Sequence, residues 1–341
     1  MEVRGRSLKG IVAGGRLAEG CELCYPGAKA VIFITGTCDD ACFYCPVSRD
    51  RLYNDVMFVN EEPVCSVEEV VVEVARMGAL GASITGGDPL TAVDRVIDVI
   101  RSLKENFGSR FHIHLYTTGR QASVEVLRAL WVSGLDEIRF HPVDLRFLKS
   151  VERAVRYTGM AVGIEIPIAP GLEEWAMKVI LEASRMGVAF VNLNEMEFVE
   201  PNAINLRLRG YRESRVRPFT VDGALETALK VLEWARSLNL APIHFCPAQF
   251  KDRIQTRNRM RRLAELDRSW YEKPTSDGTL TWVEMRGEDG TVARVHPDML
   301  SYIEGKGTPV VVEAHPTRRR LRVLEYELGD RHPGRQLNPR G

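Results

Sequence analysis

The chain has 341 residues, which is long enough to bury a sizeable core and to form one large domain and a small one. Its 46 basic and 46 acidic residues cancel, and 45% of the residues are hydrophobic. This composition argues against a disordered chain and against a protein that coats nucleic acid. The sequence contains no stretch of about 18 apolar residues, and residues 1–20 lack the apolar core of a signal peptide, so we expect a cytoplasmic protein.

Strands and helices are predicted to alternate along most of the chain. Residues 30–35 form a short apolar run with β-branched side chains, which is typical of a buried strand. Residues 66–79 begin with Ser66 and carry Glu69 three positions later, a pattern that starts a helix. Further strands are predicted at 81–85, 111–117, 137–143, 161–168, 190–198 and 242–246, and further helices at 91–107, 123–132, 145–157, 172–186 and 223–238. Repeated strand–helix units imply parallel strands with right-handed crossovers, so the fold class is α/β, a partial or nearly closed (β/α) barrel with its chemistry at the carboxyl ends of the strands.

Beyond Pro274 the pattern changes to short β-rich runs at 279–285, 291–296, 309–314 and 321–328, separated by turns rich in Gly and Pro. They predict a small antiparallel β appendage at the C-terminal end. The expected organisation is therefore an N-terminal segment over 1–29, a barrel domain over 30–270, a small β domain over 275–329 and a disordered tail over 330–341.

Three of the seven cysteines, Cys38, Cys42 and Cys45, follow the first predicted strand with the spacing C-x3-C-x2-C. Three thiolates on one short loop can hold three corners of a cubane iron–sulfur cluster and leave the fourth iron without a protein ligand. An open site on a redox metal lets a second molecule bind and be reduced, so the spacing favours an enzyme over an electron carrier. The alternatives are a structural zinc site completed by a distant ligand, or buried thiols.

The cysteine loop, with Tyr44 before its last cysteine, resembles the cluster loop of the radical S-adenosylmethionine (SAM) superfamily. A second motif, Gly86-Gly87-Asp88-Pro89, is similar to the Gly-Gly-Glu-Pro motif of that superfamily, with Asp in place of Glu. The chain is thus identified as a radical SAM protein, nearest to activating-enzyme-like members.

The resemblance implies a 4Fe–4S cluster that splits SAM into a 5′-deoxyadenosyl radical, which abstracts a hydrogen from the substrate. It also implies a one-electron donor of the flavodoxin or ferredoxin type. The residues that it assigns are the cluster ligands Cys38, Cys42 and Cys45, the adenine contact Tyr44, and the contacts to the methionine amino group Gly86, Gly87 and Asp88.

Polar and apolar residues alternate within the later predicted strands. Because the apolar positions must face the surrounding helices, the polar ones must face the lumen of the barrel. The inward positions are His112, His114, Tyr116, Glu137, Arg139, His141, Glu165, Asn192, Asn194, His244 and Cys246. A lumen filled only for packing would carry Val, Ile and Leu, so we predict a chamber for a polar substrate, although any single histidine could equally be a hydrogen-bonded core residue.

Within this chamber we expect Arg139 to bind a carboxylate or phosphate of the substrate. We expect Glu165 or Asn194 to bind the ribose hydroxyls of SAM. His141 and Cys246 complete the candidate catalytic residues.

Two other features leave alternatives open. Cys21 and Cys24 have the C-x2-C spacing of a metal site and, together with Cys246, could hold zinc or an auxiliary cluster; they could equally be an inert or disulfide-capable pair. The basic segment 251–262 is either a solvated amphipathic helix or a phosphate-contacting helix for an RNA or nucleotide substrate. The alternative function is therefore a metal-stabilised, non-catalytic RNA-binding protein.

Overall fold

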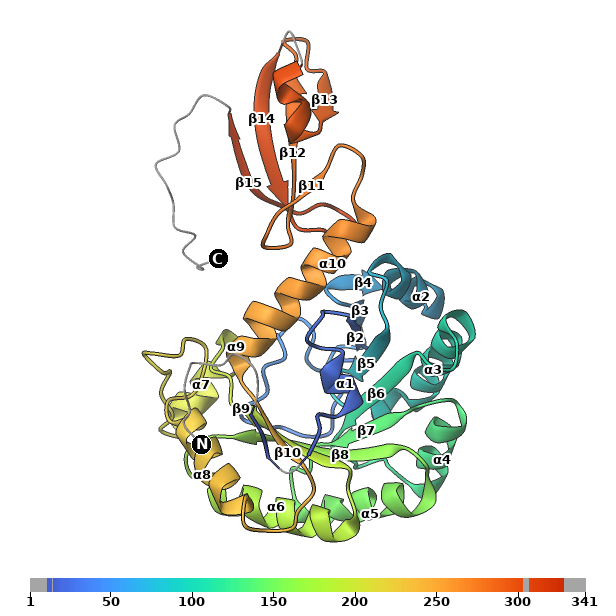
Figure 1. Cartoon of the computed structure of the whole chain (residues 1–341). Helices are drawn as coiled ribbons and strands as arrows, with labels where there is room; N and C mark the ends of the chain where they lie inside the picture. Colours follow the sequence, from blue (N-terminus) through green and yellow to red (C-terminus); the bar gives the residue numbers. More distant parts are fainter. Residues whose placement is uncertain (1–10, 14, 303–306, 328–341) are drawn as a thin grey trace. The chain divides into compact units, whose positions relative to one another are not determined.

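The computed structural model describes residues 11–13, 15–302 and 307–327, and the chain divides into two compact units, Met1–Asn258 and Arg259–Gly341 (Figure 1). The predicted tail over 330–341 lies outside the described residues.

The larger unit is built on one ten-stranded sheet with the order β1-β10-β9-β8-β7-β6-β5-β2-β3-β4. Its parallel strands are β2 (Lys29–Phe33), β5 (Gly81–Thr85), β6 (His112–Thr117), β7 (Glu137–Phe140), β8 (Ala161–Ile168), β9 (Phe190–Glu195) and β10 (Ile243–Cys246). The helices that surround the curved sheet are α2 (Val67–Arg76), α3 (Val93–Phe107), α4 (Val124–Val132), α5 (Leu148–Tyr157), α6 (Glu173–Met186) and α8 (Ala224–Ala235) (Figure 1). The strand order begins at β1 and ends at β4, so the described sheet is a partial barrel and the predicted fold class is confirmed.

The alternation predicted for the strands places the apolar side chains between sheet and helices. Ile113, Leu115, Ile138 and Phe140 are completely buried, as are the corresponding residues of β8 and β9. On the helix side, α3 buries Val96, Val99, Ile100 and Leu103, which recur at helical spacing along one face. The outer layer of the core thus follows directly from the sequence pattern.

Several short elements of the larger unit were not predicted. These are β1 (Ile11–Ala13), which pairs with β10, the hairpin β3 (Met57–Val59) and β4 (Glu62–Val64), which extends the sheet beyond β2, and the helices α1 (Glu19–Glu22), α7 (Glu200–Leu208) and α9 (Ala248–Phe250). Each spans only three to nine residues. Such short segments carry too few residues to show a period in sequence.

The smaller unit is the expected antiparallel appendage. Its strands are β11 (Lys273–Pro274), β12 (Leu280–Arg286), β13 (Val292–Val295), β14 (Thr308–Ala314) and β15 (Arg322–Glu327). Trp282, Val310, Val312 and Ala314 form its core, against which Tyr271 packs. The helix α10 (Arg257–Asp267) precedes these strands in the chain.

The helix α1 lies inside the barrel of the larger unit (Figure 1). It can approach the strands because residue 20 is glycine: a Cβ at Gly20 would lie 2.4 Å from His114 Nδ1 and 2.8 Å from a guanidinium nitrogen of Arg139. The Gly20 carbonyl accepts a hydrogen bond from Lys29 Nζ at 3.2 Å. The amino-terminal part of the lumen is therefore filled by the chain itself.

Arg139 is the centre of a buried polar network beside α1. Its side chain is 2% exposed, and Nε donates to Glu137 Oε1 at 2.5 Å. Its two terminal nitrogens donate to Glu165 Oε2 and Cys21 Sγ, both at 3.3 Å. Burial alone would raise the pKa of the Glu137 carboxyl, but the charge of Arg139, with the added effect of His112, outweighs burial and holds that pKa at about 2.

At the carboxyl ends of β2 and β5, two backbone segments meet without side chains between them. The Gly87 N–H donates to the Thr35 carbonyl at 2.8 Å, and the Asp88 N–H donates to the Thr37 carbonyl at 2.8 Å. A Cβ at Gly87 would lie 2.3 Å from the Thr37 oxygen and 2.6 Å from the Gly36 oxygen. Only glycine at position 87 allows the segment after β2 to lie this close to the segment after β5.

Replacing Gly87 by Ala should lower the free energy of unfolding by about 3 kcal/mol, because the new methyl group meets two backbone carbonyls that cannot rotate away. The measurement is urea-induced unfolding. Gly171→Ala is the control: it imposes a positive φ of 87° on alanine but meets no atom within 4 Å, so it should cost about 1 kcal/mol. Equal losses in the two variants would contradict the steric explanation.

Replacing Arg139 by Leu should destabilise the fold by about 3–5 kcal/mol at pH 7, because Glu137 is left as a buried carboxylate without its guanidinium. The double variant Arg139→Leu/Glu137→Leu should recover part of this loss. Since the folded pKa of Glu137 is about 2 and its ordinary value is 4.5, its stabilising effect is present above pH 4.5 and is lost as the pH falls toward 2.

Unfolding measured between pH 7 and pH 2 distinguishes the two variants. The double variant should lose less stability than the wild type over the acidic range. An Arg139→Leu protein as stable as the wild type would show that the network does not stabilise the fold.

Candidate functional site

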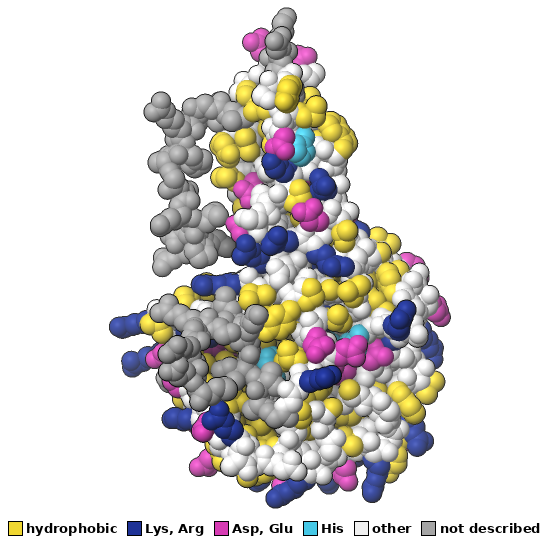
Figure 2. Space-filling model, viewed as in Figure 1, with side chains coloured by type: hydrophobic (Ala, Val, Ile, Leu, Met, Phe, Trp, Pro, Cys, Tyr) yellow, Lys and Arg dark blue, Asp and Glu magenta, His cyan; other side chains and the backbone are white. Residues whose placement is uncertain are grey.

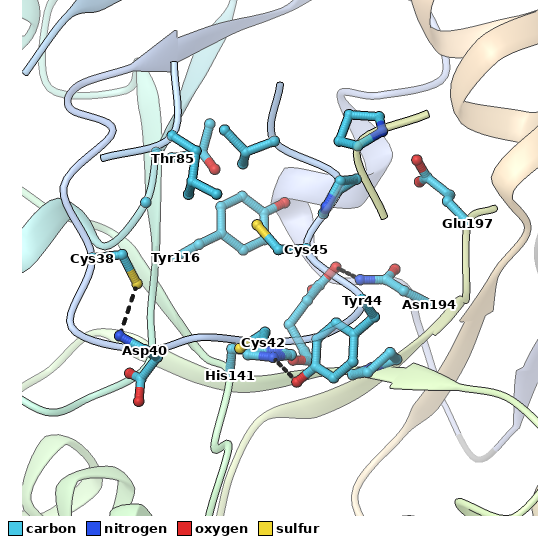
Figure 3. A pocket seen from close by; sticks show the side chains of 18 of the residues that line it. Cys38, Asp40, Cys42, Tyr44, Cys45, Thr85, Tyr116, His141, Asn194 and Glu197 are labelled. Carbon is cyan, nitrogen blue, oxygen red and sulfur yellow. Dashed lines mark hydrogen bonds between the residues drawn. The ribbon is translucent and has the colours of Figure 1, made fainter. Parts of the chain in front are cut away.

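A cavity of about 870 Å³ lies at the carboxyl ends of the parallel strands in the larger unit. Its lining includes Thr85 and Thr117, which end β5 and β6, and Pro167 and Asn194, which lie one residue before the ends of β8 and β9. Most of the cysteine loop after β2 also lines it. Of the site residues predicted from sequence, the cavity brings together Cys38, Cys42, Tyr44, Cys45, Gly86, Gly87, His141, Glu165 and Asn194 (Figure 3). Asp88, Arg139 and Cys246 are not among the lining residues.

The three loop cysteines are free and half-buried at the cavity wall. Cys38 Sγ accepts a hydrogen bond from the Asp40 N–H at 3.4 Å (Figure 3). Burial raises the pKa of all three thiols, that of Cys42 to about 11. The thiols are therefore protonated at neutral pH, and a metal that binds them must displace their protons.

Two side-chain contacts hold the cysteine loop against the segment that follows β6. Asp40 accepts a hydrogen bond from Arg120, and Asp39 accepts one from Gln121. Because the hydrogen-bonded Gly-Gly turn fixes the start of the loop, these contacts give it a second anchor.

The Asp88 carboxylate faces away from the cavity. It is 1% exposed and accepts hydrogen bonds from both hydroxyls of Thr117 and Thr118, from the Thr118 N–H and from the Leu90 N–H. Its acceptor capacity is used within the protein, so the groups of the motif that line the cavity are Gly86, Gly87 and Pro89. This arrangement differs from the direct ligand contact expected for Asp88 from the sequence.

Tyr44 and His141 form one side of the cavity. The Tyr44 hydroxyl lies 2.8 Å from His141 Nε2 (Figure 3). His141 Nδ1 lies 2.8 Å from the Glu165 carbonyl oxygen. Burial lowers the pKa of His141, so the imidazole ring is neutral. Its Nδ1–H donates a hydrogen bond to the Glu165 carbonyl, and its Nε2 accepts a hydrogen bond from the Tyr44 hydroxyl. The chain of hydrogen bonds fixes the orientation of both rings.

The Glu165 carboxylate lies at the boundary between the cavity and the buried network. Asn194 Nδ2 donates to its Oε1 at 2.8 Å, and Asn192 Nδ2 donates to its Oε2 at 2.7 Å. Asn194 Oδ1 is buried and makes no hydrogen bond with another described residue. A buried amide oxygen without a donor, at the wall of a cavity, fits a ligand that brings an O–H or N–H group.

Sequence reasoning missed the wall formed by α7, whereas the cavity-lining Lys251 belongs to the basic segment 251–262 that the sequence analysis named. Pro201, Asn205 and Arg209 line the cavity from α7 and its C-terminal end, and Lys251 Nζ donates to Glu197 Oε1 at 2.8 Å. Lys251 begins a π-helical segment, Lys251–Thr256, a kind of irregularity that is frequent at functional sites. The signal in the sequence was position: Glu197 lies near the end of the strand predicted at 190–198, and Lys251 follows the strand predicted at 242–246.

Cys21 and Cys24 are buried in the lumen, and Cys246 pairs in register with Asn194. Burial raises the pKa of the Cys246 thiol to about 12. Within the described ranges, no three His, Cys, Asp or Glu side chains are gathered closely enough to hold a metal ion, and this holds for these three cysteines as for the loop cysteines. The second metal site therefore stays a prediction.

None of the helices in the described part of the chain is both long and apolar enough to cross a lipid bilayer.

Solved structures with a partly similar chain trace have low sequence identity to this chain. Streptococcus suis SuiB bound to the precursor peptide SuiA has a TM-score of 0.49 and 11% identity over 64% of this chain and 48% of that one. Coproporphyrinogen III oxidase (HemN) from Escherichia coli has a TM-score of 0.40 and 11% identity over 64% of this chain and 56% of that one. The chain thus spans about half the length of these structures.

Comparison of the amino-acid sequence gives higher identity than these solved structures have. Residues 32–155 match the model of the radical SAM superfamily, and this range contains both the cysteine loop and the Gly-Gly turn. A protein of Methanocaldococcus jannaschii named "Putative glycyl-radical enzyme activating enzyme" is 37% identical over 275 residues, which cover 78% of this chain and 72% of that protein. The chain belongs to the radical SAM superfamily and is an activating-enzyme-like radical SAM enzyme.

Proposed function

We propose that Cys38, Cys42 and Cys45 hold a 4Fe–4S cluster with one open iron, and that SAM binds at this iron within the cavity. The observation that carries the proposal is that three thiols of one loop and the Gly-Gly turn line the same cavity. Three thiolates are the soft donors that iron–sulfur clusters take. When bound, the cluster supplies one electron that splits SAM, and the resulting 5′-deoxyadenosyl radical abstracts a hydrogen from a polar substrate.

The side chains around the loop supply contacts to SAM. Tyr44, fixed by its bond to His141, presents its ring for the adenine. The backbone of Gly86 and Gly87 contacts the methionine part, because the Asp88 carboxylate is taken up by Thr117 and Thr118. Glu165 and the unpaired Asn194 oxygen suit the ribose hydroxyls.

Arg139 is a positioning residue in this proposal. Arg139 contacts the Glu165 carboxylate from the buried side and thereby orients it. Glu165 lines the cavity, whereas Arg139 does not. His141 acts in the same way on Tyr44. Cys246 lies beside Asn194 and contributes packing to this wall.

The name of the M. jannaschii relative suggests a polypeptide as substrate, with the hydrogen removed from a glycine residue. A flavodoxin- or ferredoxin-type donor would supply the electron. The superfamily match runs through both the cysteine loop and the Gly-Gly turn, which favours the enzyme over the non-catalytic RNA-binding alternative.

The loop cysteines can be tested one by one in protein reconstituted with iron and sulfide without oxygen. Replacing Cys42 by Ala should lower 5′-deoxyadenosine formation from SAM and reductant by at least about a hundredfold, because a cluster ligand is lost. Cys65→Ala is the matched control, since Cys65 is exposed and does not line the cavity. A Cys42→Ala protein with wild-type iron content and wild-type 5′-deoxyadenosine formation would contradict the proposal.

A further inference from the structure

Two arginines at the mouth of the cavity have no acidic partner in the part of the chain that the structure describes. Arg49 follows the cysteine loop, and Arg209 caps α7; both line the cavity and both are exposed to solvent. Neither forms an ion pair with another residue in the described ranges. Arg209 instead lies over the Phe43 ring, with its guanidinium carbon 4.4 Å from the ring centre.

The carboxylates of the cavity wall are all paired. Asp40 binds Arg120, Glu165 binds Arg139, Glu195 binds Arg217 and Glu197 binds Lys251. Among charged groups that line the cavity, this leaves Arg49 and Arg209 as exposed cations whose charge no neighbouring acid neutralises. The mouth therefore attracts a negatively charged partner.

Exposed apolar side chains border the same mouth. Tyr53 lines the cavity and is 57% exposed, and its backbone is held in the left-handed region with a φ of 63°. On α7, Ile204 and Leu208 are 57% and 78% exposed and lie one turn apart, on the helix face that adjoins the one through which Asn205 and Arg209 line the cavity. Contact with the apolar side chains of a partner would remove this exposed surface from water.

We propose that this mouth surface, defined as Arg49, Tyr53, Ile204, Leu208 and Arg209, docks a polypeptide segment that carries acidic and aliphatic residues. The segment would bring the reacting residue into the cavity. This inference rests on the proposed function, because it assigns the substrate side of the same site.

The chemistry of the surface favours a polypeptide over a nucleic acid. Single-stranded nucleic acids are bound by several aromatic side chains that stack on bases, whereas the mouth surface has one aromatic ring, Tyr53, beside the aliphatic Ile204 and Leu208. On the face drawn in Figure 2, basic and acidic side chains of the larger unit are interspersed. An acidic electron donor on this surface would cover the entrance to the cavity, so we assign the surface to the substrate.

Fluorescence anisotropy of labelled probes with the full-length, cluster-loaded protein tests the proposal. The probes are a peptide of repeated Glu-Leu-Gly units and a peptide of repeated Lys-Leu-Gly units with the same length; an RNA oligonucleotide of matching negative charge serves as competitor. The acidic peptide should bind about tenfold more tightly than the basic one. Arg49→Gln/Arg209→Gln should weaken acidic-peptide binding about tenfold, and Ile204→Ser/Leu208→Ser about threefold.

Arg101→Gln/Arg153→Gln is the matched control, because both arginines are exposed on the outer helices α3 and α5. It should leave binding unchanged. Equal affinity for the two peptides would overturn the proposal, and so would a control variant that weakens binding as much as the mouth variants do. RNA that competes as strongly as unlabelled acidic peptide would also overturn it and would reassign the surface to nucleic acid. Binding is measured without reductant, so a protein that binds the peptide but does not cleave SAM would refute the proposed function and not the docking surface.

Discussion

The site depends on the close approach of two backbones at the carboxyl ends of β2 and β5. The Gly87 and Asp88 N–H groups bind the carbonyls of Thr35 and Thr37, and the first cysteine of the loop follows directly at position 38. The glycines leave room for this contact, and the Asp88 carboxylate ties the same turn to Thr117 and Thr118 at the end of β6. The ends of β2, β5 and β6 are therefore fixed to one another by backbone and threonine hydrogen bonds. These bonds determine where the cysteine loop begins.

Below the cavity, the lumen of the barrel is filled by polar side chains. A lumen that served only for packing would be filled by apolar ones. Burying Arg139, Glu137 and Lys29 is costly, and the structure compensates by pairing the two charges of opposite sign and by giving Lys29 the Gly20 carbonyl and His114 as partners. The network ends at Glu165, which reaches the cavity. A rigid, hydrogen-bonded floor holds the cavity side chains in place and limits the entry of water from the amino-terminal end of the barrel.

The sequence predicted the outer architecture well, because alternation in strands and helical spacing in helices are local signals. It also predicted which loop and which turn lie together, since the carboxyl ends of neighbouring parallel strands share one edge. It failed where the outcome depends on tertiary contacts. Arg139 was expected in the cavity, but α1 occupies the lumen and leaves the guanidinium buried with Glu137. The direction of the Asp88 carboxylate depends on Thr117 and Thr118, far away in the chain, and no local pattern encodes that pairing.

The electron paramagnetic resonance spectrum of the reduced, cluster-loaded protein tests most directly whether three thiolates leave an iron open to SAM. Addition of SAM should shift the g values of the cluster signal, and SAM labelled with ¹⁵N at its amino group should add a nitrogen coupling to the cluster. A cluster signal that is unchanged by saturating SAM would contradict an open iron in this cavity.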